Sequence, residues 1–230
     1  ATWCKDASEI INNNFDNKIS SIVVGGTGMY IDKILNGLIQ IPKIPEKIKK
    51  DSEFLLNEKG SEKFAKLVKA IDLKAVNKIS TNDIVRLRRI WEVNKFTDNN
   101  LSYWLQNKNK KYLKVNNYLI YLFTPDRKTI YEKINNRFLK MIKKGAIDEV
   151  SKLYSLDLDV SLPIMRAHGV PEIIKYLSNS ISLEECIKKG QQVTRNYVKR
   201  QFTWWRSSRL QINQIFEQFP DEINLNLLKF

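Results

Sequence analysis

The chain has 230 residues, of which 43% are hydrophobic and 10% aromatic, so a buried core is expected and an intrinsically disordered protein is excluded. No apolar run approaches the roughly 20 residues of a membrane span, and no signal-peptide pattern is present, so no membrane association is expected. With 39 Lys and Arg against 25 Asp and Glu, the net charge of +14 favours a polyanionic partner. A lysine-rich solvated surface would produce the same charge, so the placement of the cations must decide.

Cysteine and histidine usage argues against a metal centre. Cys4 and Cys186 form neither a disulfide framework nor a C-x-x-C pair, which favours a reducing, cytoplasmic compartment. His168 is the single histidine and cannot build a metal cage alone. It is also too isolated in the sequence to be promoted as a catalyst.

The first informative stretch is a predicted buried strand at residues 20–24 that leads into Gly25-Gly26-Thr27-Gly28. A helix is expected at residues 30–38, ending at Gly37. Glycines between a strand and a helix let backbone N–H groups approach a phosphate. The lysine and the Ser/Thr of a G-x-x-x-x-G-K-[ST] loop are missing, however. A phosphate site, another part of such a site and a plain tight turn all remain open.

Further along, residues 39–50 contain two prolines and are expected to be a linker into a helical, lysine-rich segment at residues 46–111. A second apolar strand is predicted at residues 118–123, followed by a helix that starts at Thr124-Pro125-Asp126 and ends before Gly145. A shorter helix containing Ile147 and Val150 comes next.

The last predicted helix opens with a capping box at residues 182–185 and runs to about residue 208. The fold class is therefore α/β, with a core interrupted by a helical insertion. We expect residues 1–38 and 113–230 to form the core with its C-terminal helices, and residues 39–112 to form the insertion.

Cations follow one line along the last helix. At 100° per residue, Lys188, Arg195, Lys199 and Arg206 share a face, whereas Cys186, Val193, Tyr197 and Trp204 lie opposite. A solvated face normally mixes charges of both signs, but residues 188–209 contain no Asp or Glu. This stripe predicts contact with a polyanion.

Two other arginine segments leave their alternatives open. In residues 82–93, Ile84, Leu87 and Trp91 share one face, while Arg86 and Arg89 lie nearly opposite. The arginine forks suit phosphate binding, but buried ion pairing with Glu92 or Asp83 has equal weight. In residues 162–169, Arg166 suits a phosphate or diphosphate clamp, although a structural arginine at a helix end is favoured from spacing alone.

Five segments together resemble one family, the bacterial-type tRNA dimethylallyltransferases, also called tRNA isopentenyltransferases. They are IVVGGTGMYI (22–31), NDIVRLRRIWEV (82–93), FTPDRKTIYEKINNRF…GAIDEV (123–150), LPIMRAHG (162–169) and TRNYVKRQFTWWRS (194–207). They occur in the family's order at about its spacing and cover essentially the whole chain.

The resemblance implies a P-loop-kinase-like α/β core with an inserted all-helical domain. It also implies transfer of a dimethylallyl group from dimethylallyl diphosphate to N6 of the adenine 3′ of the anticodon, in tRNAs that read codons beginning with U. The adenine would leave the anticodon loop and enter a channel, and Mg²⁺ would support the leaving diphosphate.

Carried over by position, the resemblance assigns residues to three tasks. The adenine channel would include Gly26, Thr27 and Tyr30, and Arg166 would neutralise the diphosphate. The anticodon stem-loop would be held by residues from four segments: Thr27, Lys49, Val85, Arg86, Leu87, Arg88, Arg89, Arg195, Asn196, Tyr197, Val198, Lys199 and Arg200.

Two segments that the resemblance implies are missing from these 230 residues: the phosphate loop G-P-T-A-S-G-K-T, and the S-x-D-S segment whose aspartate is the general base. Smaller departures are Gly28-Met29 in the glycine turn, Thr97-Asp98, and His168-Gly-Val170 where a Val-Gly-Tyr run is common. No catalytic residue, Mg²⁺ ligand or other metal ligand is therefore expected in this chain. We expect it to be feeble or inactive alone, with a separate N-terminal fragment as a candidate partner. The alternative is a non-catalytic, basic RNA-binding fragment that grips the anticodon stem-loop.

Overall fold

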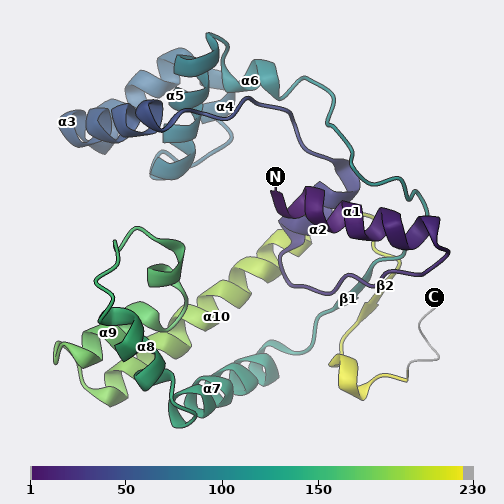
Figure 1. The fold of residues 1–230 in the computed structure, drawn as a ribbon, viewed down its shortest axis with the longest axis vertical. Helices are drawn as coiled ribbons and strands as arrows, with labels where there is room; N and C mark the ends of the chain where they lie inside the picture. Colours follow the sequence, from purple (N-terminus) through teal and green to yellow (C-terminus); the bar gives the residue numbers. More distant parts are fainter. Residues whose placement is uncertain (1, 225–230) are drawn as a thin grey trace. The chain divides into compact units, whose positions relative to one another are not determined.

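The chain forms two compact units in a computed structural model that describes residues 2–224. Unit 1 comprises Ala1–Ser21 and Tyr30–Val115, and unit 2 comprises Ile22–Met29 and Asn116–Phe230. Both units are therefore discontinuous in sequence, and each is described by itself (Figure 1). The predicted division at residues 38/39 and 112/113 stays a prediction.

Unit 1 is helical, and α3 and α5 form its centre. Its helices are α1 (Thr2–Asp16), α2 (Gly28–Asn36, of which residues 30–36 belong here), α3 (Glu46–Ile71), α4 (Leu73–Val76), α5 (Ile84–Thr97) and α6 (Leu101–Trp104). Helix α3 is two helical segments joined at Gly60, whose φ of 74° is a conformation that glycine adopts without strain. Helix α2 ends before Gly37, as predicted, and this glycine has φ 80°.

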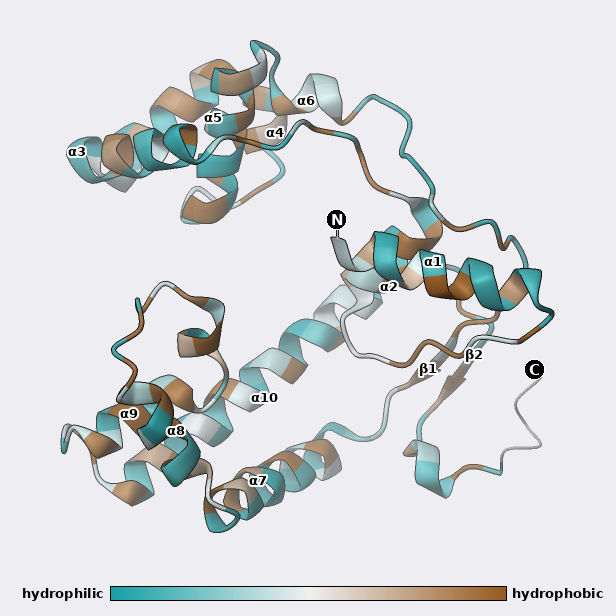
Figure 2. Cartoon of the chain, viewed as in Figure 1, coloured by the Kyte–Doolittle hydropathy of each residue, from teal (hydrophilic) through white to brown (hydrophobic). Residues whose placement is uncertain are grey.

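The core of unit 1 lies between α3 and α5. Phe64 and Val68 of α3 pack with Leu87 and Ile90 of α5, and all four side chains are buried. Figure 2 shows hydrophobic residues along both helices, with hydrophilic residues between them. Helix α5 begins at Asp83, whose carboxylate accepts a hydrogen bond from the backbone N–H of Arg86 at 3.1 Å.

Unit 2 combines a small parallel sheet with helices. Strands β1 (Tyr121–Phe123) and β2 (Gln214–Phe216) pair in parallel, with Leu122 opposite Ile215. The other elements are α7 (Arg127–Lys143), α8 (Ala146–Tyr154), η1 (Pro163–Arg166), α9 (Val170–Leu177), α10 (Leu183–Ser207) and η2 (Pro220–Glu222). Figure 1 shows α10 as the long helix of this unit, with α8 and α9 beside its first half.

Glycine allows α7 and α10 to pack closely in unit 2. Phe138 of α7 is buried directly against Gly190 of α10, where a Cβ atom would overlap the phenyl ring. A second apolar cluster joins Val150 of α8, Ile173 of α9 and Cys186 of α10. Burial in this cluster raises the pKa of the Cys186 thiol, and the nearby Glu172 carboxylate raises it further.

The predicted starts of α7 and α10 are confirmed, but of the capping box at residues 182–185 only the Ser182 half is formed, because the Glu185 carboxylate pairs with Lys189. Ser182 accepts a hydrogen bond from the N–H of Glu185 at 3.1 Å and starts α10, which ends at Ser207. Asp126 is the residue that caps α7, so Pro125 precedes the helix instead of lying in its first turn. Hydrogen bonding from the backbone N–H of Thr129 lowers the pKa of Asp126. The contribution of this cap to the stability of the folded protein is therefore present at pH values above the ordinary pKa of a carboxyl group. It is lost as the pH falls.

Three predicted elements are wrong or shorter than expected. The buried strand at residues 20–24 does not form: these residues are irregular, and Ile22 and Val24 are 71% and 90% exposed. A strand needs a hydrogen-bonded neighbour, and among residues 2–224 none pairs with this segment. The second strand covers only residues 121–123. The helical segment ends at Trp104, after which Lys110 forms an isolated antiparallel bridge with Leu38.

No helix within residues 2–224 is both long and apolar enough to cross a bilayer.

Candidate nucleic-acid interface

The glycine turn of unit 2 packs against one face of α10. Gly26 lies against Gln201 and Gly28 against the indole of Trp204, each so closely that a Cβ atom would overlap the facing side chain. Between these glycines, the Thr27 hydroxyl lies 3.3 Å from the Tyr197 hydroxyl. Tyr197, Gln201 and Trp204 follow one another at spacings of four and three, which is one helix face. In this arrangement Gly26 and Gly28 allow close approach to a helix.

Replacing Gly28 with alanine is therefore expected to lower the free energy of unfolding by about 1–3 kcal/mol, because the new methyl group overpacks the Trp204 ring. Gly25 is the matched control, since a Cβ atom there would meet nothing within 4 Å. Urea denaturation followed by circular dichroism measures both variants. Equal stability of G28A and G25A would contradict the close packing of this turn.

Tyr197 is the centre of a larger group of side chains in unit 2. The His168 ring meets it edge-on, with centroids 4.9 Å apart and planes at 70°. The Arg200 guanidinium lies 5.6 Å from the centroid of the Tyr197 ring. We call Thr27, His168, Tyr197 and Arg200 the Tyr197 cluster.

The Tyr197 cluster unites two segments that the resemblance assigns to tRNA, the glycine turn and residues 195–200, and adds His168. His168 has no other candidate catalytic residue near it in the sequence, but in the folded chain its ring contacts Tyr197. Twenty-nine positions separate His168 from Tyr197, so no helical or strand periodicity could have revealed the contact. Packing of the segment between η1 and α9 places the ring there.

The basic stripe on α10 has a neutralised end and a cationic end. Lys188 pairs with Glu184 and Lys189 with Glu185, each at 2.7 Å, one turn away. The hydrogen bond to Glu184 raises the pKa of Lys188. From Lys199 to Arg209, none of the cations forms an ion pair with a described carboxylate. The second half of the helix is therefore where phosphate groups would find uncompensated charge.

Arg195 is held by neutral groups. Its guanidinium donates to the Asn135 Oδ1 of α7 and to the Gln192 Oε1, both at 2.6 Å. These amides orient the side chain without cancelling its charge. The neighbouring Asn196 is exposed and accepts from Gln192, while Val198 is half-buried.

In unit 1, ion pairing accounts for two of the arginines on α5. Arg88 donates to the buried Ser52 hydroxyl at 3.0 Å and lies 3.8 Å from the Glu92 carboxylate. Arg86 pairs with Asp83 at 2.9 Å but is 69% exposed, so a ligand could still reach it. The alternative of buried ion pairing was predicted for Arg86 and Arg89. Arg86 forms its pair with Asp83 at the surface, and Arg89 forms no ion pair with a carboxylate of the described residues, so only Arg88 shows the more buried arrangement.

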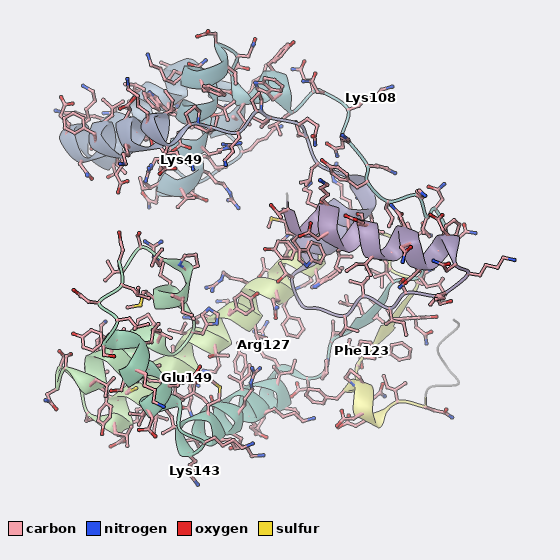
Figure 3. All side chains as sticks on the ribbon, in the orientation of Figure 1. Lys49, Lys108, Phe123, Arg127, Lys143 and Glu149 are labelled. Atoms are coloured by element: carbon pink, nitrogen blue, oxygen red, sulfur yellow. The ribbon has the colours of Figure 1, made fainter. Side chains whose placement is uncertain are left out.

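The other predicted RNA residues of unit 1 differ in their exposure. Val85 is 80% exposed, Arg89 is half-buried, and Leu87 is fully buried in the core, so the Leu87 side chain cannot meet a ligand. Lys49 lies in the first turn of α3, where it pairs with Glu46 at 2.9 Å and lowers the pKa of that carboxyl (Figure 3). Tyr30 stacks on Trp3, with ring centroids 4.6 Å apart.

Arg166 is an exposed cation at the end of η1. Its Nε donates to the Val160 carbonyl at 3.4 Å, and no carboxylate in the described residues forms an ion pair with it. The guanidinium could therefore bind an anion through its remaining N–H groups, and the diphosphate role stays a prediction.

The described residues do not suit a metal ion. No group of three or more His, Cys, Asp or Glu side chains within residues 2–224 could hold one. The Mg²⁺ implied by the resemblance therefore has no fitting ligand set in this part of the chain, and no step is assigned to it.

Solved structures share this fold. A eukaryotic dimethylallyltransferase acting on tRNA aligns with a TM-score of 0.68 at 20% identity, covering 88% of this chain and 51% of that one. The tRNA isopentenylpyrophosphate transferase of Bacillus halodurans aligns with a TM-score of 0.54 at 27% identity, covering 93% of this chain and 65% of that one. The predicted α/β class with a P-loop-kinase-like fold is thereby confirmed.

Sequence relatives define the family. The family model described as IPP transferase matches residues 1–208, so this chain belongs to the IPP transferase family. The tRNA dimethylallyltransferase of Wolbachia sp. subsp. Brugia malayi is 42% identical over 205 residues, which are 89% of this chain and 68% of that protein. The enzyme of the same name from Ehrlichia ruminantium is 37% identical over 230 residues, 100% of this chain and 74% of that protein. The chain thus spans about two thirds to three quarters of the length of these relatives.

Proposed function

We propose that this protein is a tRNA prenyltransferase that modifies the adenine 3′ of the anticodon in tRNAs reading codons that begin with U. The donor is dimethylallyl diphosphate and the acceptor is the exocyclic N6 amine. The match of residues 1–208 to the IPP transferase family supports prenyl transfer as the class of reaction. A cytoplasmic location follows from the proposed substrate.

One structural observation supports the RNA side of this proposal. The Tyr197 cluster on α10 includes Arg200, a cation that forms no ion pair with a carboxylate of the described residues. A phosphate of the RNA would meet Arg200, while Thr27 and Tyr197 offer hydroxyl groups to an unstacked base. Extruding one base from an anticodon loop costs less than opening a duplex, because the base is already unpaired.

The proposed reaction is a substitution at the first carbon of the prenyl group. The N6 lone pair forms the new C–N bond, the C–O bond to the diphosphate breaks, and the diphosphate leaves with the bonding electrons. N6 then loses a proton to a base. In this chain Arg166 would neutralise the leaving diphosphate, and residues of α5 and α10 would hold the stem-loop.

The base and the phosphate loop are not assigned to residues of this chain. Neither G-P-T-A-S-G-K-T nor S-x-D-S occurs in its 230 residues. We propose that a segment carrying both motifs is needed for turnover. Deprotonating the nucleophile and binding the diphosphate are large contributions to catalysis, so little transfer is expected without that segment.

Label transfer tests the function. Purified chain, Mg²⁺, labelled dimethylallyl diphosphate and unmodified tRNA are incubated with and without the N-terminal segment of a relative. A tRNA with guanine in place of the target adenine is the control. Label in the adenine tRNA alone, and only with the added segment, is the expected result. Transfer by the chain alone would contradict the need for that segment. No transfer and no tRNA binding in either arm would overturn the proposed function.

A further inference from the structure

His168 occupies a position in unit 2 that its sequence context does not explain. The ring is exposed, yet the residues around it are anchored: Met165 is buried, and Gly169 adopts φ 98° against Phe138. The N–H of Val170 donates to the Ala167 carbonyl at 3.0 Å and closes the turn around His168. The backbone therefore holds an imidazole at the surface, with its ring against Tyr197.

The contact with Tyr197 ties this imidazole to the predicted RNA surface. The Tyr197 hydroxyl lies at Thr27, and Arg200 lies beside the same aromatic ring. An aromatic ring and a cation that share one platform are typical of sites that stack a base and contact its phosphate.

The elements around His168 carry charges of both signs. Helix η1 contributes Arg166, and α10 contributes Arg200, which lies beside the Tyr197 ring. Helix α9 contributes Glu172, which is half-buried and has one carboxylate oxygen out of contact with water near Cys186. Asp159, upstream of η1, accepts from the Ser161 N–H at 2.7 Å. None of these carboxylates forms an ion pair with His168 in the described part of the chain, so an approaching phosphate would be the new anionic partner.

We propose that His168 is a tRNA-binding residue of the Tyr197 cluster and that it contacts RNA phosphate in its imidazolium form. This inference rests on the proposed function. A phosphate contact favours the imidazolium form over the neutral ring, so by linkage the affinity for tRNA rises as the pH falls.

The composition of the chain makes this inference testable. His168 is the only histidine among 230 residues, and both cysteines are buried. Histidine is the side-chain type that ordinarily changes its charge between pH 6 and 8, so variants at this one position test the expected pH dependence. The variants are H168F, which keeps an aromatic edge against Tyr197, and H168Q, which keeps a hydrogen-bonding group. Both side chains are uncharged at every pH used.

The measurement is tRNA affinity at pH 6, 7 and 8, at constant ionic strength and with the melting temperature of each variant recorded. Wild type is expected to bind about three- to tenfold more tightly at pH 6 than at pH 8, and both variants should lose this dependence. The imidazole NMR resonance of wild type should show RNA-induced protonation at pH 7. A flat wild-type profile, or variants that keep its slope, would overturn the role of His168 while leaving the proposed function standing. Absence of tRNA binding at all three pH values would overturn both.

Discussion

Replacing Arg88 with alanine is expected to lower the free energy of unfolding of unit 1 by about 2–4 kcal/mol. Arg88 joins α5 to α3 through the Ser52 hydroxyl at 3.0 Å and the Lys49 carbonyl at 2.9 Å. Ser52 is fully buried and donates to the Glu92 carboxylate at 2.8 Å. Without the guanidinium, a nearly buried carboxylate loses its positive partner, and two acceptors lose their donors.

Arg86→Ala is the matched control for this variant, because it removes the same side chain from the same helix. The Arg86 pair with Asp83 is largely exposed, and such pairs contribute less than about 1 kcal/mol. Urea denaturation measures global stability, and hydrogen exchange of amides in α3 and α5 reports on unit 1 alone. If R88A and R86A prove equally stable, the buried network does not hold the two helices together.

Replacing Lys199 and Arg200 together with alanine is expected to weaken tRNA binding by at least about tenfold at 0.1 M salt. Neither cation pairs with a carboxylate in the described residues, so each is available to a phosphate. Every lost phosphate contact lowers the slope of log affinity against log salt by about one, so the double variant should lose about two. Filter binding across a salt series measures both quantities.

Lys188 and Lys189 provide the control on the same helix. Alanine at both positions also removes two positive charges from α10, but these charges are already neutralised by Glu184 and Glu185. The K188A/K189A variant should therefore keep its salt slope. Equal losses in the two double variants would show that net charge, not the cationic end of α10, governs the affinity.

The helices and their start signals could be predicted from sequence because they depend on neighbours a few positions apart. Ser182 and Asp126 cap the helices that follow them, and the 3.6-residue period of α10 separates Cys186 from the cationic face. The same reasoning failed at residues 20–24. A run of apolar, β-branched residues favours an extended backbone, but a strand forms only where another strand supplies hydrogen bonds.

Tertiary structure decided which cations are held by other protein groups and which remain available to a ligand. Arg86 and Arg88 lie two positions apart in one arginine-rich segment, yet only Arg88 reaches a buried serine on another helix. The stripe on α10 was predicted as one cationic surface, but Lys188 at its start is paired with Glu184 and the adjacent Lys189 with Glu185.

By itself, the sequence determined the family and the basic character of the last helix, through five segments in a shared order and through local periodicity. Only the tertiary structure showed that a side chain at Gly26 or Gly28 would overlap a residue of α10. It also showed that His168 and Thr27 both contact Tyr197. The physical reason is distance along the chain. Thr27 and Tyr197 are 170 positions apart, and a contact of that kind is set by how helices and turns pack, which no local pattern records.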